Sequence, residues 1–228
     1  MFENFKADLA AALERDPAAK NKLEIYLTYG GFRALCSYRR AHWFYTHNMK
    51  MLSFFITARA RRVYGIDIHP GATIGKGVFI DHGVGVVIGE TAEIGDDCTI
   101  YQGVTLGGTG KDVGKRHPTI GKGVMISAGA KVLGPVIIGD YSKIGAGSVV
   151  LRNVPPHCTV VGVPGHIVRM HGEKYNDLNQ KLPDPVLDEF ARINKRLETI
   201  EDNLNIPACR YSISMEEEYD DSWDGANI

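Results

Sequence analysis

The sequence predicts a mixed fold, in which an N-terminal α-helical segment precedes a parallel β-helix and a helix with a flexible acidic tail follows it. Three observations predict this order. An apolar residue returns every six residues between positions 68 and 150, helical apolar stripes occupy much of residues 3–64, and another stripe occupies residues 184–204. We therefore expect a helical segment at 1–65, a β-helix that carries the chemistry at 66–168, and a C-terminal extension at 169–228.

The six-residue period is clearest in an uninterrupted run of hexads that begin at Ile120, Ile126, Val132, Ile138, Ile144 and Val150. An earlier run begins at Ile68, Ile74 and Ile80, and it restarts at Ile88, Ile94, Ile100 and Leu106. A period of six is neither helical nor a simple strand alternation, so it indicates short strands joined by turns. Three such sides form one triangular coil whose apolar residues point inward, and each coil stacks only on its neighbours.

Two interruptions of this period are where we expect the chemistry. The spacing is 8 between Ile80 and Ile88, and the extra residues fall within 81–85. The spacing is 14 between Leu106 and Ile120, which is two hexads plus two residues or one hexad with an eight-residue insertion. Insertions leave a solenoid as surface loops, often on its binding face.

Before the repeat, residues 3–15 place apolar side chains on one face and predict a short amphipathic helix. Asp16 and Pro17 suit the N-cap and the first turn of a following helix. Two further helices are expected at 31–46 and 49–64, with a break at 46–48 and with Gly65 closing the second. Their aromatic stripes are interpreted as packing surface.

After the repeat, the helical stripe of residues 184–204 is formed by Val186, Leu187, Phe190, Ile193, Leu197 and Ile200. The final residues, 212–228, are rich in Asp and Glu, so we expect a flexible tail. The tail ends in Ile228, a bulky apolar residue that carries the free carboxylate.

Composition excludes several classes of protein. A net charge of -1 argues against nucleic acid as a partner, and the four cysteines have no paired spacing that would indicate disulfides or a thiolate zinc site. The N-terminus lacks the features of a secretory signal. The longest apolar run, Met51 to Ile56, is far shorter than the roughly 20 residues of a membrane span. We expect a soluble cytoplasmic protein.

The first interruption contains Asp81 and His82, and Asp67 precedes His82 by nearly one coil of sequence. Residues about one coil apart lie close together, so Asp67 could accept a hydrogen bond from one ring nitrogen of His82. The other nitrogen would then be free to take a proton from a hydroxyl group. An ordinary corner histidine beside a capping aspartate fits the same spacing.

The second interruption contains Arg116 and His117. An arginine fork can bind a carboxylate, and the adjacent histidine can donate to the same anion or to a developing oxyanion. A solvated basic loop fits this pair equally well. A metal site formed by His69, His82 and His117 is also conceivable, but their positions do not form a compact ligand motif, so we predict no metal.

Several motifs closely resemble the serine O-acetyltransferases of the hexapeptide-repeat acyltransferase family. The resemblance runs from about Asp16 to Val168, and its motifs are Arg15-Asp16-Pro17-Ala18, Asp67-Ile68-His69-Pro70, Ile80-Asp81-His82, Val87-Ile88-Gly89-Glu90-Thr91, Gly107-Gly108-Thr109-Gly110-Lys111 and Arg116-His117-Pro118. The hexads alone are common to many acyltransferases, but this combination is much more specific. The resemblance implies that the β-helix is left-handed.

It also implies transfer of an acetyl group from acetyl-CoA to the hydroxyl of L-serine, the first step of cysteine biosynthesis from serine. By the same resemblance, His82 is the general base, Asp67 orients it, and His117 assists at the site. The ammonium group of serine is expected to bind Asp16 and Asp81. Its carboxylate is expected to bind Arg116, with Glu90 as a partner of His117.

The co-substrate acetyl-CoA is expected along the edge of the solenoid, between neighbouring subunits, at Thr109, Ala128, Lys143, Gly145 and Ala146. The resemblance further implies a homotrimer whose sites combine two chains, feedback inhibition by L-cysteine, and insertion of Ile228 into O-acetylserine sulfhydrylase. A trimer is favoured over a hexamer because the helical segment before the repeat is short. The pair Gly165-His166 departs from the family pattern near the CoA nucleotide.

Two other functions remain open at this point. The chain could be another hexapeptide acetyltransferase that acts on a sugar or an antibiotic hydroxyl, since the fold alone does not choose the substrate. It could instead be a trimeric scaffold without enzymatic activity, whose tail recruits a partner. The clamp of Asp16, Asp81 and Arg116 favours an amino acid, because a sugar needs no such charges.

Overall fold

The computed structural model describes residues 2–110, 114–174, 192–197 and 199–200. The chain divides into two compact units, residues 1–178 and 179–228, and each is described by itself. In the second unit, residues 192–197 and 199–200 are helical, which confirms that part of the helix predicted at 184–204. The rest of that helix, the acidic tail, Cys209 and Ile228 lie outside the described residues.

The first unit begins with four helices: α1 (Phe2–Arg15), α2 (Lys22–Thr28), α3 (Gly30–Thr46) and α4 (Lys50–Tyr64). The helices expected at 3–15, 31–46 and 49–64 are therefore confirmed. Asn48, with a φ of 61°, lies in the turn that separates α3 from α4. Gly65 ends α4 in the left-handed conformation with a φ of 68°. Among the described helices, none is long and apolar enough to cross a membrane.

The helix α2 was missed in the sequence, and the predicted role of Asp16 as a helix N-cap is wrong. Residues 16–21 form a non-helical link with a turn at 17–18, in which the Asp16 carboxylate accepts a hydrogen bond from the Ala18 N–H at 2.8 Å. The N-cap of α2 is Asn21, whose side chain accepts from the Glu24 N–H at 2.9 Å. The Asp16 side chain therefore caps no helix and is available to the site.

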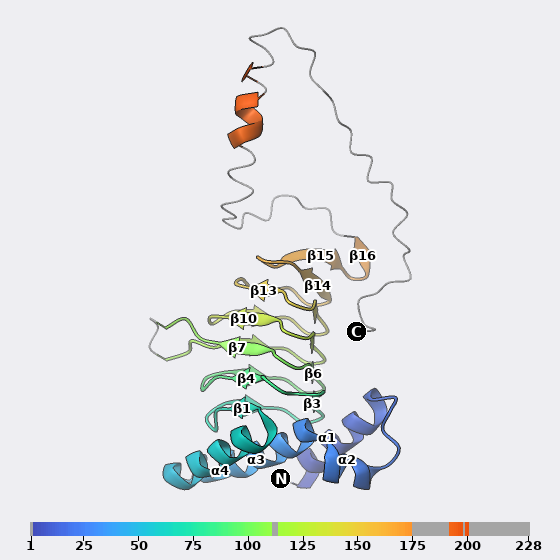
Figure 1. The fold of residues 1–228 in the computed structure, drawn as a ribbon, viewed down its shortest axis with the longest axis vertical. Helices are drawn as coiled ribbons and strands as arrows, with labels where there is room; N and C mark the ends of the chain where they lie inside the picture. Colours follow the sequence, from blue (N-terminus) through green and yellow to red (C-terminus); the bar gives the residue numbers. More distant parts are fainter. Residues whose placement is uncertain (1, 111–113, 175–191, 198, 201–228) are drawn as a thin grey trace. The chain divides into compact units, whose positions relative to one another are not determined.

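The repeat forms three faces of parallel strands that stack coil upon coil (Figure 1). The first face contains β1 (Asp67–Ile68), β4 (Val87–Ile88), β7 (Thr105–Gly107), β10 (Lys131–Leu133) and β13 (Val149–Val150). The second face contains β2 (Thr73–Ile74), β5 (Glu93–Ile94), β8 (Thr119–Ile120) and β11 (Ile137–Ile138). The third face contains β3 (Phe79–Ile80), β6 (Thr99–Ile100), β9 (Met125–Ile126), β12 (Lys143–Ile144) and β14 (Cys158–Val161).

The strand register gives the length of each coil in residues. Asp67 pairs with Val87, whereas Val87 pairs with Thr105, so the first coil is slightly longer than the second and contains the first interruption. Thr105 pairs with Lys131, and this longest coil shows that the second interruption is one hexad with an eight-residue insertion. Both insertions lie at corners of the triangle, where they add chain without disturbing the ladders.

The first residue of each predicted hexad points into the coil, and these residues form one continuous core. Ile88, Ile100, Ile126 and Ile144 are each at most 1% exposed. Burying an isoleucine side chain contributes about 2 kcal/mol, so the stacked core is the main source of stability. Polar or charged residues precede many of these positions on the strands and face outward.

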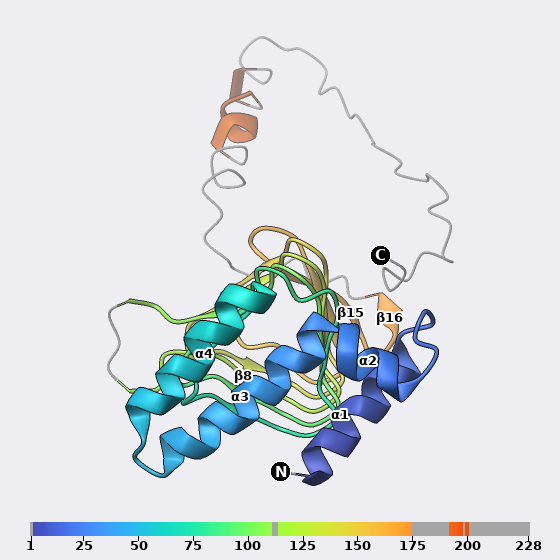
Figure 2. The ribbon, with the colours of Figure 1, turned by 60° about the horizontal axis from the view of Figure 1, so that its bottom comes forward.

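The helices close the start of the coil. Figure 2 shows α1, α3 and α4 lying across this end. The backbone of α3 packs so tightly there that a Cβ at Gly31 would overlap the carbonyl oxygen of Ile80. The buried Asp8 of α1 forms an ion pair of 2.7 Å with Arg39 of α3, and Arg39 also donates to the carbonyl of Gly75 at 2.7 Å. These contacts fix α1 against the first coil.

The other end of the third face is covered by two antiparallel strands. β15 (His166–Met170) pairs with β14, and β16 (Glu173–Lys174) pairs with β15. The expected change of structure after the last hexad is thus confirmed, but the sequence did not predict these strands.

Candidate active site

The corner between the third and first faces carries Asp81 and His82, and we call it the Asp81 corner. These residues directly follow β3. His82 adopts the left-handed conformation, with a φ of 54°, so the chain turns sharply there. The His82 side chain is 76% exposed, and its Nε2 lies 3.8 Å from an Asp81 carboxylate oxygen. The imidazole is thus open to a substrate and close to a carboxylate.

The end of α1 brings Asp16 to the same corner. The Tyr29 hydroxyl, from the link between α2 and α3, donates to the Asp16 carboxylate at 2.5 Å. Burial raises the pKa of Asp81, and the negative charge of Asp16 also raises it, whereas His82 lowers it. The charges of two carboxylates therefore act on the same corner beside His82, an arrangement that favours binding of a cation.

The predicted partner of His82 has another contact in this structure. The Asp67 carboxylate, in β1, accepts a hydrogen bond from Arg61 of α4 at 3.1 Å. No hydrogen bond joins Asp67 to His82 in the described part of the chain. The residue one coil beyond Asp67 is Val87, so His82 falls short of a full coil and is out of register with Asp67. The role of Asp67 in orienting His82 stays a prediction.

The corner between the first and second faces carries residues 89–92 and 114–118, and we call it the Arg116 corner. Arg116 forms an ion pair of 3.1 Å with the Glu90 carboxylate. The Tyr45 hydroxyl donates to the other Glu90 oxygen at 3.5 Å. The family resemblance implied that Glu90 partners His117, whereas in the structure Glu90 forms an ion pair with Arg116. The Arg116 side chain is 42% exposed and keeps donors for a carboxylate ligand.

His117 is held by Thr91 from the preceding coil. The Thr91 N–H donates to Nδ1 of His117 at 3.1 Å, and the Thr91 hydroxyl lies 2.9 Å from the same nitrogen. These contacts assign Nδ1 as the acceptor, so Nε2 carries the proton of the neutral ring. Burial and then the Arg116 charge lower the pKa of His117, which keeps the ring neutral. His117 is therefore suited to donate a hydrogen bond from Nε2 to an anion.

The two corners lie at opposite ends of β4, since His82 precedes this strand and Glu90 follows it. One face of the coil separates them by roughly 15 to 20 Å, because a strand advances about 3.3 Å per residue. A serine molecule cannot bridge that distance. The structure therefore groups Asp16, Asp81 and His82, and separately groups Glu90, Arg116 and His117.

The residues predicted to bind CoA divide in the same way. Ala128, Gly145 and Ala146 lie at the turns that stack along the Asp81 corner, and Lys143 is exposed in β12 on the adjoining third face. Thr109 is exposed in the long loop of the Arg116 corner, beyond β7. Residues 111–113 of this loop lie outside the described residues.

Sequence reasoning missed Tyr29 and Thr91, which hold Asp16 and His117. No local signal marks Tyr29, because its partner lies on a separate element. Thr91 could have been found from the register. Glu93 pairs with Thr119, so Thr91 occupies the position of His117 in the preceding coil. This register depends on the size of the insertion before His117, which the spacing left open.

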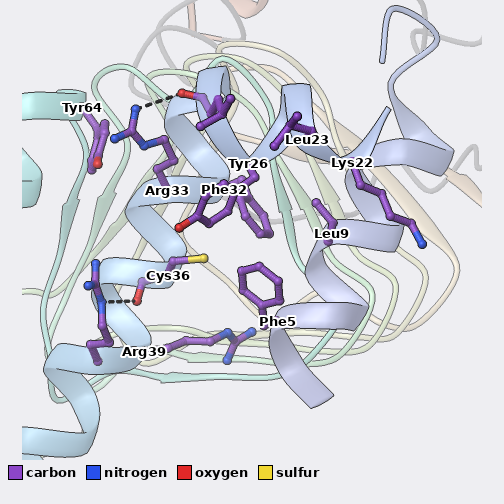
Figure 3. A pocket seen from close by; sticks show the side chains of 12 residues that line it. Phe5, Leu9, Lys22, Leu23, Tyr26, Phe32, Arg33, Cys36, Arg39 and Tyr64 are labelled. Carbon is purple, nitrogen blue, oxygen red and sulfur yellow. Dashed lines mark hydrogen bonds between the residues drawn. The ribbon is translucent and has the colours of Figure 1, made fainter. Parts of the chain in front are cut away.

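A cavity of about 910 Å³ lies among the N-terminal helices, and none of the predicted site residues lines it (Figure 3). Its wall combines apolar side chains, such as Phe5 and Tyr26, with cations such as Arg33. Within the described ranges, no three His, Cys, Asp or Glu side chains are grouped to hold a metal ion.

Two family models match the chain. The model described as "Serine acetyltransferase, N-terminal" matches residues 1–37, and the model described as "Bacterial transferase hexapeptide (six repeats)" matches residues 117–152. A serine acetyltransferase of Synechococcus elongatus is 49% identical over 219 residues, which are 94% of this chain and 90% of that protein.

Three similar solved structures are of serine acetyltransferases with ligands. The Neisseria gonorrhoeae protein in complex with serine is 47% identical, with a TM-score of 0.72, over 74% of this chain and 69% of that one. The Brucella abortus protein in complex with coenzyme A is 46% identical, with a TM-score of 0.72, over 73% and 67%. A complex with cysteine is 47% identical, with a TM-score of 0.71, over 72% and 68%.

These similarities confirm the left-handed hexapeptide-repeat β-helix that the motifs implied. They extend across the N-terminal helices, the coil and both insertions, and they are far too high to reflect a shared fold alone. The chain belongs to the serine acetyltransferase family.

Proposed function

We propose that this protein transfers an acetyl group from acetyl-CoA to the hydroxyl of L-serine, giving O-acetyl-L-serine and CoA. The observation that carries the proposal is the exposed His82 beside the Asp81 carboxylate, at a corner where the charge of Asp16 also acts. A pair of carboxylates next to a base suits a substrate with both an ammonium group and a hydroxyl. The relatives that bind serine and coenzyme A support the same reaction.

The proposed roles follow from this charge distribution. Asp16 and Asp81 bind the serine ammonium, and Arg116 binds its carboxylate with Glu90 holding the guanidinium. His82 is the general base. His117 donates from Nε2 to the substrate carboxylate or to the oxyanion of the transition state.

Within one chain, the Asp81 corner and the Arg116 corner lie too far apart to bind the same serine molecule. We therefore assign each site to two chains of a homotrimer. The Asp81 corner of one subunit meets the Arg116 corner of the next, and closed threefold symmetry repeats this contact. The same arrangement joins Thr109 of one subunit to Ala128, Lys143, Gly145 and Ala146 of its neighbour. Acetyl-CoA then lies in the groove between the subunits.

The transfer is direct. His82 takes the proton of the serine hydroxyl as the hydroxyl oxygen attacks the thioester carbonyl. The tetrahedral intermediate collapses, the bond from carbon to sulfur breaks, and the imidazolium returns its proton to the CoA thiolate. Asp67 turns toward His82 in this step and stabilises the imidazolium. Holding hydroxyl and thioester together removes much of the orientational cost.

Regulation and partners complete the proposal. L-cysteine resembles serine in its ammonium and carboxylate groups, so it competes for the same clamp, and a relative binds cysteine. Ile228 carries a free carboxylate on an acidic tail, which suits capture by O-acetylserine sulfhydrylase in the cytoplasm. Residues 1–65 supply Asp16, residues 66–168 carry the chemistry, and residues 169–228 recruit this partner.

The test is CoA thiol release from acetyl-CoA with L-serine, followed by a panel of other amino acids, sugars and aminoglycosides. We expect release with serine and suppression by L-cysteine. Release with a sugar and not with serine would keep the fold and overturn the clamp. Binding of sulfhydrylase without any acetyl transfer would instead identify a scaffold.

A further inference from the structure

Tyr29 connects the helical layer to the carboxylates of the Asp81 corner. It stands between α2 and α3, where it is the last residue before α3. Its hydroxyl donates to Oδ2 of Asp16 at 2.5 Å, while the Ala18 N–H donates to Oδ1 at 2.8 Å. Both oxygens of Asp16 are thus held, one by the backbone of its own turn and one by Tyr29.

The phenol keeps its proton at neutral pH. The hydrogen bond to Asp16 raises the pKa of Tyr29 to about 12, with smaller contributions from burial and from the charges of Asp16, Glu24 and Asp81. Tyr29 is therefore a permanent donor to the carboxylate over the working range of the enzyme.

A donor at the Asp81 corner reduces the repulsion between the negative charges of Asp16 and Asp81. Asp16 and Asp81 both act on Tyr101, whose pKa is raised by burial and then by these two carboxylates. The same two carboxylates raise one another's energy when both are ionised and no cation is present. A hydrogen bond to the ionised form of one of them reduces this cost, and a charge-assisted bond is among the strongest available.

We propose that Tyr29 is a positioning residue for serine binding, which holds the Asp16 carboxylate in a fixed orientation at the Asp81 corner before the ammonium group arrives. This inference rests on the proposed function, since it assigns Asp16 to the ammonium of serine. It adds a residue that does not touch the substrate, and it gives the N-terminal helices a part in affinity for serine. Tyr29 acts on substrate binding and leaves the chemical step to His82.

The test is Tyr29→Phe, which removes only the hydroxyl. We expect KM for serine to rise about tenfold, the scale of one hydrogen bond to a charged group, with kcat within about twofold of the wild type. Affinity for CoA should not change.

Tyr26→Phe is the matched control, because Tyr26 lies in α2 one turn earlier, is 51% exposed and has no hydrogen bond from its hydroxyl in the described structure. This variant should leave KM and kcat for serine unchanged. A double-mutant cycle then separates positioning from simple stabilisation. In an Asp16→Asn background, Tyr29→Phe should have little further effect on KM.

An unchanged KM for serine in Tyr29→Phe would overturn the inference while leaving the proposed function intact. Equal and additive losses in both backgrounds would show that Tyr29 only stabilises the helices, and this too would overturn it. Absence of serine turnover in the wild type would instead be a failure of the proposed function.

Discussion

The backbone of Gly89 lies directly against the imidazole ring of His117, so closely that a Cβ at position 89 would overlap Cδ2 and Nε2 of the ring. Gly108 approaches the same Nε2 from the long loop, at 3.1 Å from an added Cβ. The ring is thus seated between two glycines while Thr91 holds its Nδ1. This seat fixes the direction in which Nε2 donates.

Gly89→Ala should therefore displace His117. We expect kcat/KM for serine to fall roughly 10- to 100-fold, because small misplacements of a catalytic group are costly. The added methyl group should reduce the free energy of unfolding by about 1–3 kcal/mol. Steady-state kinetics and urea unfolding measure the two effects. Gly30→Ala is the control, since a Cβ there meets open space, and it should change neither. Wild-type kinetics in Gly89→Ala would show that the seat of His117 does not matter.

His82→Ala should reduce kcat by roughly 10² to 10⁴, the contribution of a positioned general base, with acetyl-CoA affinity retained. The measurement is thiol release together with calorimetric titration of CoA. Loss of CoA binding along with turnover would assign His82 a structural role.

Mixed trimers should test whether two chains share a site. His82→Ala and His117→Ala should each be nearly inactive alone. When the two variants are unfolded together and refolded, random assembly should restore about a quarter of the wild-type activity, because some interfaces then receive both intact histidines. Activity that stays at the level of the separate variants would contradict a shared site.

Asp67→Asn and Arg61→Ala distinguish two roles of Asp67. The ion pair is exposed, so each variant should change the free energy of unfolding by less than about 1 kcal/mol. If Asp67 orients His82, Asp67→Asn lowers kcat strongly, whereas Arg61→Ala preserves it. A parallel comparison of kcat in both variants decides the question. Equal, small effects in both would leave Asp67 as a partner of Arg61 only.

His117 should make the protein less stable in mild acid. Its pKa is lowered in the folded state, by burial first, from an ordinary value of 6.5. The unfolded state therefore binds a proton more readily than the folded state. The free energy of unfolding keeps its full value above pH 6.5 and decreases as the pH falls through the lower pKa of the folded state. Urea unfolding between pH 7.5 and 5.5 should show a shallower loss of stability in His117→Gln than in the wild type. Identical slopes would contradict a buried, neutral imidazole.

Removal of Ile228 should abolish binding to O-acetylserine sulfhydrylase and leave serine acetylation unchanged. The reason is that recognition of a chain end depends on the terminal side chain and its carboxylate. The measurement compares the affinities of the protein with and without Ile228 for immobilised sulfhydrylase. Addition of one Gly after Ile228 is a useful companion, since it keeps the side chain and moves the carboxylate. If both variants kept their affinity for sulfhydrylase, the assignment of Ile228 as the binding residue would be wrong.

The sequence predicted the coil well because its register is local. Each hexad starts with a residue such as Ile126 or Ile144 whose burial is required by the coil itself, so a spacing of six fixes the strand positions. The short helix α2 was missed because its seven residues give too few turns for a periodic signal. Its stability comes from packing, as with the buried Ile25.

The candidate site was predictable only in part, for a related reason. The residues of each corner are close in sequence, as with Asp81 and His82, and motifs identify them. Their neighbours come from other coils or from the helices, as with Thr91 and Tyr29. The spacing also suggested Asp67 as the residue that orients His82. The first coil is longer than a regular one, and in the structure Asp67 accepts a hydrogen bond from Arg61.

The antiparallel strands β15 and β16 have a consequence for aggregation. A stack of parallel strands exposes an unpaired edge at each end, and such an edge can recruit a second molecule and grow into a fibre. On the third face, β15 reverses the direction of the chain, so another parallel coil cannot continue the ladder there. The helices occupy the opposite end (Figure 2). The coil is therefore left to associate through its sides, and in the proposed homotrimer such contacts would close a ring of three copies, at which growth would stop.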